Sequence, residues 1–219
     1  LIWRQVFQAQ EIKEIRGFSF NGLMVYIFLC MIVGQLKSSW ATSMEMIDLI
    51  RTGEMNKYLI RPISFFTYHF MMFIGHNSLF YIVYSIILIL FPIIFPGWAF
   101  PSYIHVLGFL SALFISIFLS YSIYFCMVCF AFWFGEVRSL VVAYNISNII
   151  LSGQIIPLRL FPDLAQQIIY FTPLQYLVDF PVSIATDSLA INLWLPKMGI
   201  ALLWCIITTS LGLLIYKSG

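Results

Sequence analysis

A run of 32 residues from Tyr103 to Phe134 contains no aspartate, glutamate, lysine or arginine, and this feature constrains the fold most. Comparable apolar runs occur near residues 20–40, 66–95, 140–156 and 192–216. A bilayer core of ~30 Å takes about 20 apolar residues as one helix. Because 62% of the residues are hydrophobic, a soluble core of this length cannot bury them all. The sequence predicts an all-α membrane protein whose five full spans form one transmembrane domain, residues 1–219.

The start of the chain and the basic residues predict how the spans are oriented. Residues 1–7 read as the end of a further span whose first part is missing, which would make six spans. Alternation places segments 41–65 and 135–139 and the C-terminus on one side, opposite segments 8–19, 96–102 and 157–191. Counted in these segments and at the adjoining span ends, six basic residues lie on the first side and four on the second, which assigns the first side to the cytoplasm by the positive-inside rule. The six are Lys37, Arg51, Lys57, Arg61, Arg138 and Lys217, and the four are Lys13, Arg16, Arg159 and Lys197.

Charge is concentrated in the segment that follows the first full span. Thr42 with Glu45 three residues later matches a capping box, and Gly53 can end a helix in the left-handed conformation, which predicts a helix over 43–52. The candidate docking residues of this segment are Glu45, Asp48, Arg51, Glu54, Lys57 and Arg61.

The same helix has an apolar stripe, formed by Met44, Ile47 and Ile50 at three-residue spacing, that is free to bury against another surface. Two interpretations remain open at this point. The helix either docks on a protein partner, or it lies on the lipid headgroups with Lys57 and Arg61 near anionic lipid.

Prolines and amides interrupt the apolar segment between residues 153 and 181. Gly153 and Pro157 predict the end of a helix, and Pro162 the start of another. Pro173 and Pro181 would divide the remainder into pieces too short to span. We expect short helices folded back at the outer leaflet and shielded from water, with an ordinary interfacial loop as the alternative. The candidate gate residues are Gly153, Pro157, Phe161, Pro162, Pro173, Tyr176 and Pro181.

Two motifs together resemble those of type 2 ATP-binding-cassette (ABC) exporter permeases, the membrane subunits of bacterial ABC transporters. They are Gly53, Leu59, Arg61 and Pro62 in the cytoplasmic segment, and Gly153, Pro157, Phe161 and Pro162 in the outer segment. The resemblance covers nearly the whole chain. It implies a six-span subunit in the bacterial cytoplasmic membrane, paired with an identical or related permease.

The resemblance also implies how such a subunit works. Two ATPase subunits would hold ATP and magnesium and would contact the 43–61 segment as a coupling helix, while the outer segment closes the path. An amphipathic or hydrophobic substrate would then be exported by alternating access. This chain itself would bind no cofactor.

Several motifs are missing from the sequence. A G-x-x-x-x-G-K-[ST] phosphate loop is absent, so ATP would have to be bound by another polypeptide. The three histidines, His69, His76 and His105, do not form a metal-binding pattern, and nothing predicts nucleic-acid binding. A membrane-embedded lipid-modifying enzyme that uses these histidines is the alternative function, and a passive channel the third.

Overall fold

The computed structural model describes residues 16, 19–60, 62–94, 100 and 102–219, and the described residues form helices without strands. Four of these helices are long and apolar enough to cross a membrane: Phe20–Arg51, Phe65–Ile93, Tyr103–Phe134 and Ile191–Ser218. The chain is therefore a multi-pass helical membrane protein. The expected partial span at residues 1–7 lies outside the described residues.

The first of these spans is interrupted in its middle. Helix α2, Phe20–Leu36, and helix α3, Trp40–Arg51, are separated by three residues. Side chains of neighbouring helices bind the carbonyl groups that the interruption frees: Ser120 Oγ donates to Lys37 O at 2.8 Å, and Asn77 Nδ2 donates to Ser38 O at 3.3 Å. Non-helical backbone at membrane depth requires such internal partners.

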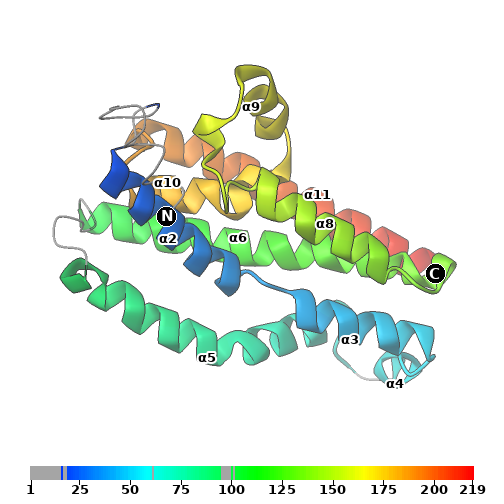
Figure 1. The fold of residues 1–219 in the computed structure, drawn as a ribbon. Coiled ribbons are helices and arrows are strands. Elements are labelled where there is room, and N and C mark those ends of the chain that lie inside the picture. The colour runs from blue at the N-terminus through cyan, green and yellow to red at the C-terminus, as the bar shows by residue number, and fades with distance from the viewer. Residues whose placement is uncertain (1–15, 17–18, 61, 95–99, 101) are drawn as a thin grey trace.

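Helix α6, Tyr103–Cys129, forms the centre of the bundle (Figure 1). It packs along α11, Trp194–Ser218, where a Cβ added to Gly212 would lie 2.8 Å from Phe125 Cδ1. Small residues allow helices in membranes to approach this closely. The 32-residue apolar run continues beyond α6 as α7, Ala131–Phe134, after a turn at Phe130.

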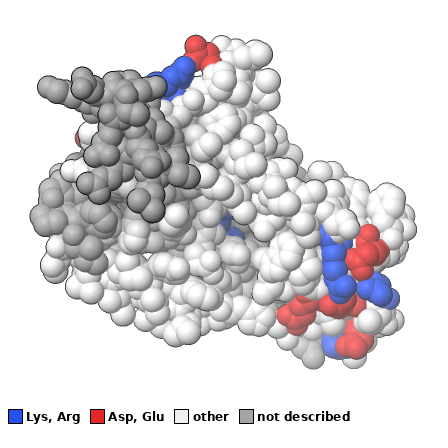
Figure 2. Space-filling view, in the orientation of Figure 1, with Lys and Arg blue, Asp and Glu red and all other residues white. Residues whose placement is uncertain are grey.

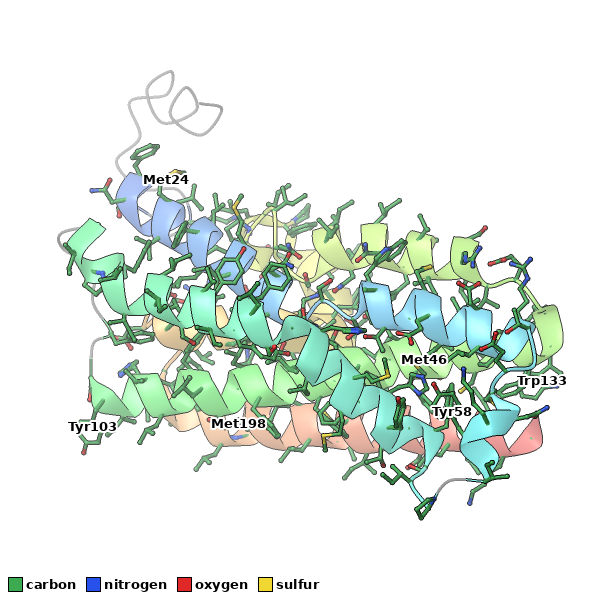
Figure 3. All side chains as sticks on the ribbon, turned by 90° about the horizontal axis from the view of Figure 1, so that it is seen from below. Met24, Met46, Tyr58, Tyr103, Trp133 and Met198 are labelled. Carbon is green, nitrogen blue, oxygen red and sulfur yellow. The ribbon has the colours of Figure 1, made fainter. Side chains whose placement is uncertain are left out.

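Helix α5, Phe65–Ile94, lies on the outside of the bundle and exposes a broad apolar face (Figure 3). The same view shows the two ends of the molecule. Met46, Tyr58 and Trp133 lie at one end, and Met24 and Tyr103 lie at the other.

The expected full span at 140–156 is shorter in the structure. Helix α8, Arg138–Leu151, has 14 residues, which at ~1.5 Å each give about 21 Å, less than a ~30 Å bilayer core. It ends early because Gly153 takes a left-handed φ of 83°. The six-span arrangement therefore remains a prediction.

Short helical elements follow α8. They are η1 Leu158–Leu160, α9 Asp163–Tyr170, η2 Pro173–Leu177, α10 Asp179–Ala185 and η3 Ile191–Leu193. Pro162 directly precedes α9 and Pro173 opens η2, as expected. Pro181 lies within the first turn of α10, just after the break at Val178, where its missing N–H costs no helical bond.

Candidate functional site

The charged segment begins earlier than the sequence predicts. Helix α3 starts at Trp40, and Ser43 N donates to Ser39 O at 3.0 Å, so Thr42 is a buried helical residue and not a cap. The capping-box prediction was therefore wrong. The predicted end is confirmed: Gly53 has a φ of 74°, and its amide donates to Ile50 O at 3.2 Å.

The buried face of α3 differs from the predicted apolar stripe, and it packs against the core of this chain. Met46, Ile47 and Leu49 are buried in the core of the chain, whereas Met44 and Ile50 are only partly buried. Of the predicted stripe, Ile47 alone is fully buried. The surface that α3 leaves free is consequently its charged face.

Ion pairs connect this charged face to the turn before α8. Arg51 Nη1 lies 2.8 Å from Glu136 Oε2, and Arg138 pairs with Asp48. Arg138 Nη1 also lies 3.7 Å from Glu136 Oε2, so the four groups form one network. All four side chains remain between 40% and 53% exposed, which leaves them accessible to a partner.

Helix α4, Asn56–Leu59, holds the end of the segment in place. Tyr58 is buried, and its ring lies 5.5 Å from that of Phe65 and 5.1 Å from that of His69. His69 is thus part of an aromatic cluster, and its Nδ1 lies 3.0 Å from Phe65 O.

Two further charged residues, Glu54 and Lys57, are exposed and paired. Lys57 Nζ lies 2.8 Å from Glu54 Oε2, and this hydrogen bond together with the lysine charge lowers the pKa of Glu54. Of the other predicted residues, Glu45 is half-buried and Arg61 lies outside the described residues. Figure 2 shows acidic and basic side chains gathered at this end of the molecule, while most of the face is uncharged.

A buried hydrogen bond connects the outer segment to α2. Tyr26 Oη donates to Asp179 Oδ1 at 2.6 Å, and the Asp179 amide donates to Ser152 O at 3.1 Å. Gly153 fits beside this pair: an added Cβ would lie 3.0 Å from Tyr26 Oη and 3.2 Å from Asp179 Cβ. Gly153 therefore allows the end of α8 to approach α2 and α10 closely.

The predicted gate residues differ in their burial. Gly153, Pro157, Tyr176 and Pro181 are buried, Phe161 and Pro173 are half-buried, and Pro162 is exposed. This chain alone does not cover the end of α9, where Tyr170 is 39% and Phe171, the next residue, 83% exposed. Their shielding from water by lipid or by a second subunit stays a prediction.

Polar contacts hold the outer elements together. Arg16 Nη1 donates to the carbonyls of Arg159 and Phe161 and lies 3.3 Å from Asp163 Oδ1. His105 Nε2 lies 3.0 Å from Asp187 Oδ1. These contacts assign His105 a structural position. Among the described residues, no group of three His, Cys, Asp or Glu side chains could hold a metal ion.

Sequence reasoning missed three buried polar residues, namely Tyr26, Lys37 and Asp179. Lys37 was counted only as a basic residue of the cytoplasmic side. The signal that was available is its place at the end of an apolar span, because ionisable residues within membranes are costly and often functional.

The full length of the chain, residues 1–219, matches the family model described as ABC-2 family transporter protein. The chain belongs to the ABC-2 transporter family. This ABC-2 chain is a permease, a membrane subunit for transport and not itself a catalyst, and the alternative of a lipid-modifying enzyme is set aside. No curated protein and no solved structure matches the sequence.

Proposed function

We propose that this ABC-2 permease is the membrane subunit of a bacterial ABC exporter. It moves an amphipathic or hydrophobic substrate outward by alternating access, powered by ATP and magnesium on two separate ATPase subunits. The observation that carries this proposal is the match of the whole chain to the ABC-2 family, in a sequence without a phosphate loop. Its expected location is the cytoplasmic membrane.

The coupling surface is the charged face of α3 and α4, with Glu45, Asp48, Arg51, Glu54, Lys57 and Arg61. Two features of the segment support this role. Its charges are exposed at one end of the molecule, and Met46, Ile47, Leu49 and Tyr58 are buried. A segment fixed in this way transmits movement of a bound partner to α2 and α5 as a rigid body.

The outer segment, residues 153–181, acts as the gate and meets the same segment of a second permease, identical or related. The exposed rings at the end of α9 support this role, because Phe171, the residue after this helix, is 83% exposed and has no cover within the described chain. Membrane lipid surrounds the apolar face of α5.

Reconstituted transport tests the proposal. The permease, purified from its native membranes with any bound ATPase, is placed in vesicles, and ATP hydrolysis is measured with and without candidate amphiphiles. Replacing Glu54 and Lys57 by alanine removes exposed charge without opening the core. We expect substrate-stimulated hydrolysis to fall about tenfold, equivalent to ~1.4 kcal/mol.

The control is Tyr103→Phe, at a side chain that is 76% exposed and lies at the other end of the molecule, outside both segments. This variant should keep substrate-stimulated ATP hydrolysis close to that of the unmodified permease. The proposal is contradicted if no ATPase accompanies the permease, or if the Glu54/Lys57 variant keeps full stimulation.

A further inference from the structure

A polar cavity of about 230 Å³ lies beside the interruption between α2 and α3, and residues of α2, α6 and α8 line it. Its polar walls include Lys37, Ser120, Tyr124, Asn145 and Gln154. None of the described residues that line it carries a carboxylate. In Figure 2, the described surface around the centre of the visible face carries no charged side chain except for one recessed basic patch.

Among the described lining residues Lys37 alone has a side chain that is ordinarily charged at neutral pH, and it is 3% exposed. None of the ion pairs of the described residues includes it, although several other basic side chains have carboxylate partners. Burial alone disfavours charge on such a side chain, and an anion bound beside it would supply the counter-charge that its ammonium form needs.

Hydrogen bonds within the chain hold the backbone of Lys37 in place without a ligand. Lys37 N donates to Val33 O at 3.1 Å, and Lys37 O accepts the hydroxyl of Ser120 at 2.8 Å. Opposite it, Tyr124 Oη donates to Asn145 Oδ1 at 3.1 Å. That bond orients the Asn145 carboxamide and leaves its nitrogen as a donor.

Gln154 forms one wall of the cavity, and its side chain packs closely against α2. A Cβ added to Gly34 would lie 2.4 Å from Gln154 Nε2, so the glycine makes room for this amide. One lysine and three carboxamides, those of Gln35, Asn145 and Gln154, therefore line the cavity, and none of the described lining residues is acidic. Such a donor set favours an anion.

The volume limits what the cavity can hold. It is smaller than the ~300–1,000 Å³ typical of sites for drug-sized ligands. It suits a single headgroup, while Met31, which lines the cavity and is 61% exposed, offers an apolar surface at its edge.

We propose that this cavity binds the anionic headgroup, a carboxylate or a phosphate, of the amphiphile that the permease transports, with Lys37 as its counter-charge. The assignment to a transported molecule rests on the proposed function, and it narrows the substrate class to anionic amphiphiles. The apolar body of the amphiphile extends past Met31 out of the cavity.

Photolabelling of the permease in nanodiscs tests the site. The probes are a diazirine-bearing fatty acid and the fatty alcohol of the same chain, and labelled peptides are identified by mass spectrometry. The acid should label the Met31–Ser38 segment or the facing part of α8 in a saturable way. The alcohol should label these peptides about tenfold less, because it lacks the charge-assisted bond.

Three variants separate charge from structure. Lys37→Met should reduce acid labelling about tenfold to the level of the alcohol, and Lys37→Arg should retain it. Lys197→Met, a second lysine within a candidate span, should leave it unchanged. Equal labelling by acid and alcohol in the unmodified protein would overturn the proposal even if Lys37→Met failed to fold.

A last arm distinguishes a transported molecule from a resident anionic lipid. In vesicles that hold the permease with its ATPase, turnover of MgATP should reduce acid labelling of the cavity, since the probe is carried away. Labelling that turnover leaves unchanged would overturn the assignment to the substrate. Labelling of the isolated permease does not depend on an ATPase, so failure of the exporter proposal would be seen separately.

Discussion

At the residue scale, Gly153 shows how one backbone position joins three elements. The sequence identifies it as the end of a helix, and its left-handed φ of 83° confirms this. The sequence does not contain the second constraint, which is that Tyr26, Asp179 and Leu158 leave no space for a side chain. That constraint arises from residues distant in the chain.

Gly153→Ala should therefore destabilise the protein. The left-handed conformation costs a non-glycine residue ~1–2 kcal/mol, and the contacts at 3.0–3.2 Å add to this. Thermal unfolding in detergent measures the effect. Gly199→Ala is the control, because nothing lies within 4 Å of its added Cβ; equal melting temperatures for the two variants would contradict the packing described.

The buried Tyr26–Asp179 bond makes a second prediction. Tyr26→Phe removes the donor of a 2.6 Å bond and leaves a buried carboxyl group without it, which should cost about 1–3 kcal/mol. Tyr103→Phe, at a residue that is 76% exposed, should cost almost nothing. Chemical unfolding of both variants measures the difference. A similar loss in both would mean that the bond does not stabilise the fold.

At the element scale, the four-charge network joins α3 to the start of α8. Its partners are 85 and 90 residues apart in the chain, so no local pattern of the sequence predicts the pairing. The same holds for the start of α3, where Thr42 and Glu45 fit a capping box that the structure does not use. Long apolar helices and the turns at Gly53 and Gly153 are predictable, since each depends on local residues alone.

Reversing one ion pair tests whether the network holds α3 in its coupling position. Arg51→Glu places like charges together and should reduce substrate-stimulated ATP hydrolysis about tenfold, a loss of ~1.4 kcal/mol. The double variant Arg51→Glu with Glu136→Arg restores an opposite-charge pair and should recover most of it. A double variant as inactive as the single one would indicate that Arg51 acts through direct contact with the ATPase.

At the scale of the whole molecule, the charged face of α3 and α4 and the outer segment lie toward different ends of the bundle (Figure 1). The apolar composition predicts the membrane and the long helices. It does not by itself predict that α8 is only 14 residues long, because that length depends on the helix ending before Gly153, which takes the left-handed conformation. The interruption after Leu36 is likewise built from side chains of α5 and α6.

Site-specific photo-crosslinking tests the central claim most directly. A photo-reactive amino acid replaces Glu54 on the coupling surface or, as the control, Asp163 on α9, and both variants are irradiated in native membranes. We expect the probe at Glu54 to capture a polypeptide with a G-x-x-x-x-G-K-[ST] phosphate loop, and the probe at Asp163 to capture none. Capture of the ATPase equally from both positions, or from neither, would contradict the account.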